Sequence, residues 1–202
     1  YIRPVEHFGS IMTFDKEVSR RYMAEGYLDA MRALGQVFGE RYYLDARNDL
    51  IGDLYLSLDD GQRAEAASRL DIVPLEGAPP EYHYLRQVLP AMERSVGTEG
   101  EAPAETSRAV LESLAEFYEV DRLTLWSPMD LLSAIADAET DPPGSVIRRH
   151  LLKLRYGRVV GFLRTISTLA GPKLRATPVR RPPGAQSVRE GLRSLLDAPA
   201  GS

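Results

Sequence analysis

Apolar residues recur every three or four positions along most of this chain, and this spacing constrains its fold more than any other feature. Near the N-terminus they fall at Met23, Tyr27, Ala30, Leu34 and Val37, and similar stripes continue to about residue 170. The spacing collects apolar side chains on one face of an α-helix, whereas a strand would show strict alternation. The pattern predicts an all-α fold: a single-domain helical bundle of about six to seven helices.

Capping and helix-breaking residues divide this pattern into segments. We expect helices from about Thr13 to Phe38, Tyr43 to Leu58, Asp59 to Leu70, Pro80 to Val96, Ser107 to Val120, Ser127 to about residue 138, and over 145–170. Asp59, Pro80 and Ser127 are typical of helix N-termini, and Gly-Pro at 171–172 of a helix end. Proline removes a backbone donor, so Pro90 is expected to kink its helix. Between these helices, residues 123–125 can form a short extended stretch.

Residues 172–202 differ in composition from the helical domain expected over 1–171. Residues 172–186 contain four prolines and four basic residues, which predicts an extended linker. Ser187 and Glu190 then match a capping box at the start of a short amphipathic helix. The helix carries one apolar stripe, made of Val188, Leu192, Leu195 and Leu196. A helix of about ten residues is not stable alone in water, so the stripe should dock on a surface of this chain, a second copy or a partner protein.

Charge is distributed unevenly along the sequence. Residues 145–202 hold 12 basic and two acidic residues, a net charge of +10, so residues 1–144 carry −14. Arg148, Arg155 and Arg158 fall near the apolar stripe of the 145–170 helix, where a guanidinium needs an anionic partner. We favour intramolecular pairing with the acidic region, and keep an external phosphate or carboxylate as the alternative. Nucleic-acid binding through residues 145–181 is a further possibility, although the acidic remainder would repel DNA.

Several classes of site are excluded by residue type and spacing. The sequence has no Cys, and His7, His83 and His150 do not stand at metal-ligand spacing, so we predict no metal site. Phosphate-loop, dinucleotide and serine-hydrolase motifs are absent, and we predict no cofactor. No apolar run approaches the roughly 20 residues of a membrane span, and no signal peptide is visible, which suggests a cytoplasmic protein. Only three of the 25 basic residues are Lys, a bias typical of GC-rich bacterial genomes.

His83 lies between two aromatic residues in the run Tyr82-His83-Tyr84-Leu85-Arg86. This run resembles a short stretch of the haem-dependent tryptophan 2,3-dioxygenases, which are also all-α. The glycine-rich loop of that family has no counterpart here, so no residue role is carried over. A lone His among aromatic residues is most often a half-buried core residue.

These observations lead to three hypotheses of different classes. The first is a non-catalytic interaction, regulatory or assembly protein that binds a protein partner or itself through the stripe of the C-terminal helix. The second is a helical enzyme or ligand-binding protein with an aromatic or anionic small-molecule pocket, and a haem-type ligand is one variant of it. Candidate pocket residues are His83, Tyr82, Tyr84, Arg148, Arg155 and Arg158. The third is nucleic-acid binding through residues 145–181.

Overall fold

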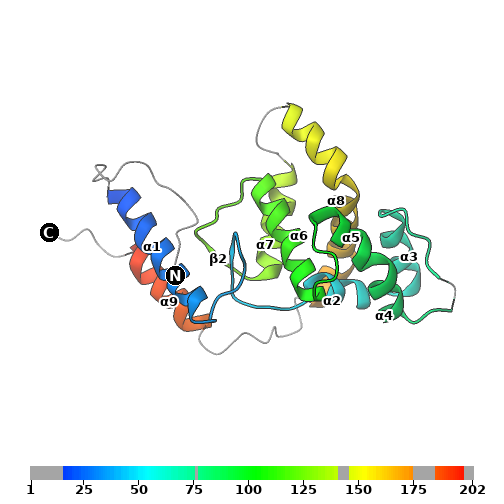
Figure 1. Cartoon of the computed structure of the whole chain (residues 1–202), viewed down its shortest axis with the longest axis horizontal. Helices are drawn as coiled ribbons and strands as arrows, with labels where there is room; N and C mark the ends of the chain where they lie inside the picture. The colour runs from blue at the N-terminus through cyan, green and yellow to red at the C-terminus, as the bar shows by residue number, and fades with distance from the viewer. Residues whose placement is uncertain (1–15, 76, 141–145, 175–184, 198–202) are drawn as a thin grey trace. The chain divides into compact units, whose positions relative to one another are not determined.

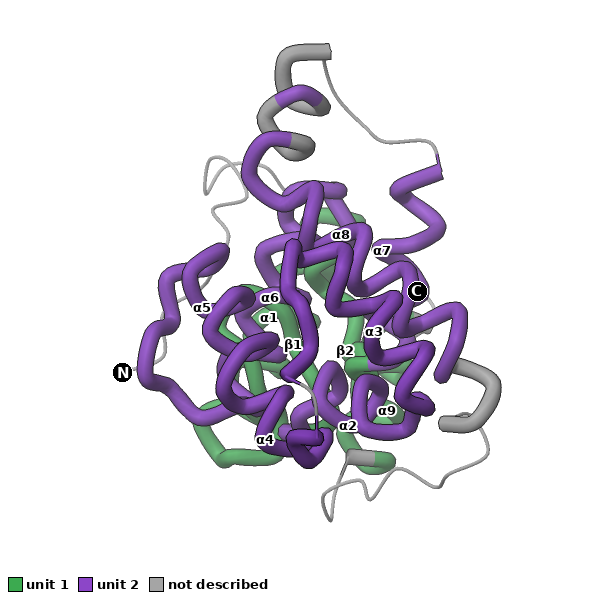
Figure 2. The backbone as a smooth tube through the Cα atoms, turned by 90° about the vertical axis from the view of Figure 1, so that its right-hand side faces the viewer, with its two compact units in different colours: residues 1–46, 121–128, 180–202 green, residues 47–120, 129–179 purple. Residues whose placement is uncertain are grey.

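The computed structural model describes residues 16–75, 77–140, 146–174 and 185–197; for residues 146–149, 151–153, 171–174, 185 and 197 only the backbone is described. Over these residues the fold is all-α with one short two-stranded sheet, as the apolar spacing predicts (Figure 1). The chain divides into two compact units (Figure 2). Unit 1 contains residues 1–46, 121–128 and 180–202, and unit 2 contains residues 47–120 and 129–179.

Unit 1 is assembled from segments that are far apart in the sequence. Helix α1 (Lys16–Ala33) packs against α9 (Ala185–Asp197) (Figure 1). Strand β1 (Tyr43–Leu44) pairs in parallel with β2 (Leu125–Trp126). Each of these elements is too short or too polar to be stable alone, so they depend on a shared core. That core consists of Ala24, Leu28, Val37, Tyr43, Leu123, Leu125, Val188 and Leu192, with Tyr27 and Met31 packed at its edge.

Unit 2 is a helical bundle. Its elements are α2 (Leu50–Leu56), α3 (Asp60–Ser68), α4 (Pro80–His83), the π-helix η1 (Tyr84–Val88), α5 (Leu89–Val96), α6 (Pro103–Phe117), α7 (Pro128–Thr140, whose first residue belongs to unit 1) and α8 (Val146–Leu174). The long helix α8 packs against α2, α3 and α5, and α6 packs against α2 and α5. Phe162 and Ile166 of α8 are fully buried, whereas Leu154 is 72% exposed.

The disturbance predicted at Pro90 takes the form of a π-helical turn directly before it. The Leu89 N–H donates to the Tyr84 carbonyl, five residues earlier. Pro90 has no N–H, and its ring crowds the carbonyl four residues back in a regular helix. The wider turn accommodates the proline without ending the helix, and π turns of this kind occur often at functional sites.

The helix expected from Tyr43 to Leu58 is wrong at its beginning. Tyr43 and Leu44 form β1, and α2 begins only at Leu50, where the Asp49 carboxylate accepts from the Gly52 N–H at 3.0 Å. The helical spacing of residues 43 and 46 is overridden by pairing with residues 125–126, which the sequence marks only as a short extended stretch. Helix α1 also ends earlier than expected, because Gly35 adopts a left-handed conformation with φ of 71°.

Three other predicted boundaries need correction. Helix α6 starts at Pro103 rather than at residue 107, with proline in the first turn, where its missing N–H costs nothing. Helix α8 continues past Pro172 to Leu174, because a proline in the last turn leaves the earlier turns intact. Helix α9 begins at Ala185, so Ser187 lies inside the helix and the predicted capping box is wrong; Glu190 accepts instead from the Gln186 side chain at 3.2 Å.

Candidate ligand-binding cleft

A cleft of about 480 Å³ opens in unit 2 beside the start of α3 and α4. Its lining combines a buried aromatic pair, an ion pair and a proline-rich wall: Tyr55, Asp60, Arg63, Pro74, Leu75, Gly77, Ala78, Pro79, Pro80 and His83. The volume lies within the range of roughly 300–1,000 Å³ that is usual for small-molecule sites. A mixed lining with a few converging polar groups is also typical of such sites.

The start of α3 positions the ion pair of the cleft. Asp59 caps the helix by accepting from the Gln62 N–H at 2.9 Å, while the Gln62 side chain accepts from the Asp59 N–H at 3.2 Å. This reciprocal cap confirms the helix start predicted at Asp59. It fixes the first turn of α3, from which Asp60 and Arg63 both reach the cleft.

Arg63 is largely buried and holds two partners. Its side chain is 14% exposed, donates to the Leu58 carbonyl and forms an ion pair with Asp60. The Asp60 side chain is 97% exposed, so this carboxylate approaches the guanidinium from the solvent side. The guanidinium of Arg63 is therefore fixed in position by its burial, whereas the exposed carboxylate of Asp60 binds to it only weakly.

Tyr55 and His83 form the buried aromatic pair. Tyr55 Oη lies 2.5 Å from His83 Nδ1, and the two rings stack with their centroids 5.9 Å apart. Burial raises the pKa of Tyr55 to about 12, even though the charge of Arg63 opposes this, so the phenol keeps its proton. Burial also lowers the pKa of His83, and the nearby Arg63 charge lowers it further, so the imidazole is neutral at pH 7.

The second ring nitrogen of His83, Nε2, has no hydrogen-bond partner among the described residues. His83 is 4% exposed, and its Nε2 atom is buried without a hydrogen-bond partner in the described parts of the chain. Buried polar atoms are nearly always hydrogen-bonded, and an exception needs an explanation. Among the described residues that line this cleft, only His83 has a buried polar atom without a hydrogen-bond partner.

The candidate pocket residues chosen from sequence are only partly brought together. His83 lines the cleft, but Tyr82 is 50% exposed, and Tyr84 is buried and donates to Asp49 at 2.9 Å. Asp49 also caps α2 and accepts from Ser107 at 2.8 Å, so Tyr84 belongs to a network that joins α2, η1 and α6.

Arg155 and Arg158, two of the three arginines of α8 chosen from sequence, do not line this cleft. Arg155 is exposed with its guanidinium over the Tyr156 ring, and Arg158 is exposed and pairs with Asp71 at 2.7 Å. The side chain of Arg148 lies outside the described residues. Arg164 of the same helix pairs with Glu139 of α7. Arg158 and Arg164 therefore pair with acidic residues of the same unit.

The four residues of the C-terminal stripe have different environments in unit 1. Val188 and Leu192 are buried in its core, Leu195 is half-buried, and Leu196 is 42% exposed. Arg189 of the same helix pairs with the fully buried Asp45 at 2.6 Å. Gly191 faces the Tyr27 hydroxyl so closely that a Cβ atom would collide with it. Helix α9 thus lies on α1 of its own chain.

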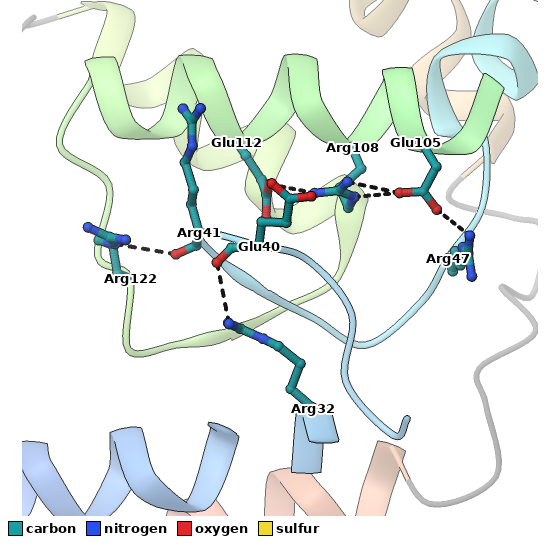
Figure 3. A network of polar contacts seen from close by, with 8 residues as sticks. All are labelled: Arg32, Glu40, Arg41, Arg47, Glu105, Arg108, Glu112 and Arg122. Atoms are coloured by element: carbon teal, nitrogen blue, oxygen red, sulfur yellow. Dashed lines mark hydrogen bonds and ion pairs between the residues drawn. The ribbon is translucent and has the colours of Figure 1, made fainter. Parts of the chain in front are cut away.

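Other charged contacts join residues of the same unit (Figure 3). In unit 2, Arg108 bridges Glu105 and the buried Glu112 at 2.9 Å each, and Arg47 reaches Glu105 at 2.5 Å. Burial opposes ionisation of Glu105, but the hydrogen bond and charge of Arg108, with those of Arg47, hold its pKa below the usual value. In unit 1, Arg32 and Arg122 donate to the backbone carbonyls of Glu40 and Arg41. These contacts stabilise the local structure of each unit.

Tyr55 and Arg63 are the cleft residues that sequence reasoning missed. Tyr55 falls inside the apolar pattern of its helix, where a tyrosine reads as a core residue. Arg63 follows the Asp59 cap by four residues, and its pairing with Asp60 was the one local signal available. Nothing in the spacing relates residues 55, 63 and 83, because they meet only through tertiary packing.

Within the described residues, no group of three or more His, Asp or Glu side chains is arranged to hold a metal ion. In the same parts of the chain, no helix has the length and apolar character of a membrane span. Comparison with known proteins gives no significant match: no family model fits the sequence, no curated protein resembles it, and no solved structure resembles its fold.

Proposed function

We propose that this protein binds a small organic molecule in the cleft between α3 and α4. The observation that carries the proposal is the buried His83, which lines a cleft of about 480 Å³ and whose Nε2 has no hydrogen-bond partner among the described residues. A group of this kind gains a hydrogen bond when a ligand arrives, because the protein does not already supply one. Arg63 and Tyr55 add a fixed charge and a fixed hydroxyl beside it.

The test is a thermal-shift screen of the purified chain against small organic acids, amines and neutral aromatic compounds. Ala78 lines the cleft and is half-buried, so Ala78→Trp should fill the site. Ala64 is exposed on α3 and does not line the cleft, so Ala64→Trp adds the same side chain elsewhere. Compounds that raise the Tm of the wild type and of Ala64→Trp, but not of Ala78→Trp, support the proposal. A panel without any such compound, or equal shifts in all three proteins, contradicts it.

Two further measurements separate this proposal from its variants. A visible absorbance spectrum distinguishes a bound haem or flavin from a colourless ligand. Retention on heparin that falls with salt would instead indicate nucleic-acid binding through the basic segment, since phosphate contacts are lost with rising salt.

A second proposal is association between copies through α9. The observation that favours it is that α9 packs on α1, through Val188, Leu192 and the Arg189–Asp45 pair among others. A second copy presents the same α1 surface, and exchange of an identical element is a low-cost route to a dimer. Light scattering of the full chain and of a variant lacking residues 183–202 tests this. A dimer that is lost on truncation supports exchange, whereas a monomer at every concentration contradicts it.

A further inference from the structure

The protonation of the Tyr55–His83 pair can be derived from their hydrogen bond. Both groups are neutral, and one hydrogen bond joins Tyr55 Oη to His83 Nδ1. If Tyr55 donates, Nδ1 is the acceptor, and the single imidazole proton must lie on Nε2. If Nδ1 donates instead, the Tyr55 proton and the Nε2 lone pair are both left without partners. The first arrangement leaves only one group unsatisfied, so Nε2 carries a buried N–H donor.

Among the described residues that line the cleft, His83 and Arg63 are donors, and the one carboxylate is that of Asp60. His83 and Arg63 both line this cleft, and burial together with the Arg63 charge lowers the pKa of His83. The acceptor is the exposed Asp60 carboxylate, which occupies Arg63 from the solvent side. An exposed ion pair contributes little to stability, so another carboxylate can replace Asp60 on Arg63 at small cost. Asp60 thus occupies the position on Arg63 that a ligand carboxylate would take.

The rest of the lining is mostly apolar. Pro74, Leu75, Pro79 and Pro80 form a proline-rich wall of the cleft, and Leu75 is 49% exposed. A ligand that covers this wall gains from burial of apolar surface, while a second charged group on it would lose hydration without a partner. The body of the ligand should therefore be apolar.

We infer that the ligand of this cleft is a monocarboxylic acid with an apolar body, whose carboxylate takes the place of Asp60 on Arg63 and accepts from Nε2–H of His83. This inference rests on the proposed binding function and specifies its ligand class. The carboxylate supplies the acceptor that His83 lacks, and the apolar body covers the proline-rich wall. The neutral amide of the same acid offers a poorer acceptor and no charge.

The test compares 3-phenylpropionate with 3-phenylpropionamide by isothermal titration calorimetry. In the wild type, the acid should bind about tenfold or more tightly than the amide, because hydrogen bonds to a charged acceptor are the stronger ones. Asp60→Asn removes the competing carboxylate from an almost fully exposed position, so it should leave the fold intact and tighten binding of the acid about three- to fivefold. Binding of the amide should not change.

Two variants complete the design. Glu65→Gln removes the same charge from another exposed acid of α3 that does not line the cleft, and it should leave both affinities unchanged. Arg63→Met should abolish the preference for the acid, with circular dichroism as the check on folding. Equal affinity for acid and amide, no gain in Asp60→Asn, or the same gain in Glu65→Gln overturns the inference. If other compounds still bind in a manner that Ala78→Trp blocks, the ligand class is wrong but the proposed function stands; if nothing binds, both fail.

Discussion

The interior of unit 1 and the cleft of unit 2 both bury titratable side chains, but they differ in how those side chains are partnered. In unit 1, the buried Asp29 accepts from Tyr43 at 2.9 Å, and the buried Asp45 pairs with Arg189 at 2.6 Å. In unit 2, His83 makes one hydrogen bond through Nδ1, and its Nε2 has no partner in the described part of the chain. Burial of a charged or polar group is thus no sign of a site by itself. Buried polar atoms without a hydrogen-bond partner among the described residues occur in both units, Arg32 Nε of unit 1 for example, but of these residues only His83 lines the cleft.

The largest loss of stability is expected where a buried carboxylate loses the arginine that pairs with it. Arg189→Ala leaves Asp45, which has no exposed area, without the guanidinium that reaches it from α9. Removing one member of such a pair should destabilise unit 1 by about 3 kcal/mol and release α9 from α1. Hydrogen exchange of the α9 amides measures this directly. Arg193→Ala, an exposed arginine on the same helix, is the control and should change little; similar exchange rates in both variants would show that the pair is not what fastens the helix.

A smaller effect is expected from the loss of a single buried hydroxyl. Tyr43→Phe removes the donor to Asp29 and should cost about 2 kcal/mol in urea unfolding, because a buried carboxylate loses a hydrogen bond. Tyr118→Phe is the matched change in unit 2, where the buried hydroxyl has no hydrogen-bond partner among the described residues. This variant should be neutral or slightly more stable. Equal losses in the two variants would remove the distinction between partnered and unpartnered groups.

The smallest effect concerns the dependence of stability on pH. The folded-state pKa of His83 lies below the ordinary value of 6.5, so below that pH the unfolded chain takes up a proton that the folded chain does not. The contribution of His83 to stability is therefore complete above about pH 6.5 and is lost as the pH falls towards the folded-state pKa. Urea unfolding between pH 7.5 and 5 should show a shallower loss in His83→Gln than in the wild type. An unchanged slope in His83→Gln would argue against a neutral buried imidazole.

The sequence predicts the parts of this molecule that depend on local interactions. The structure confirms the Asp59 cap and the helix start at Pro80, and it buries Val188 and Leu192 of the predicted apolar stripe. Each of these features depends on neighbours within one or two helical turns. The strand at Tyr43 was missed, because its partner lies at Leu125 and no local pattern announces the pairing.

The candidate site was predictable only in part for the same reason. His83 could be selected as an unusual residue among aromatics, but its partner Tyr55 lies on another helix and Arg63 on a third. Arg155 and Arg158 were candidate pocket residues because of their place on the helical wheel, yet they are exposed on α8. A helical wheel gives the direction of a side chain and cannot give the element that covers it. The apolar stripe of α9 likewise predicted docking without naming α1 as its surface.

The central claim, that His83 offers a free N–H donor at the cleft, is tested most directly by its tautomer. The protein can be labelled with ¹⁵N-histidine, and its three imidazoles are distinguished by long-range ¹H–¹⁵N correlation, with His83→Gln identifying the signal of interest. At pH 7 the predicted result is a neutral ring protonated on Nε2, whose Nε2 resonance shifts when 3-phenylpropionate is added. A ring protonated on Nδ1, or an imidazolium at pH 7, would contradict the account.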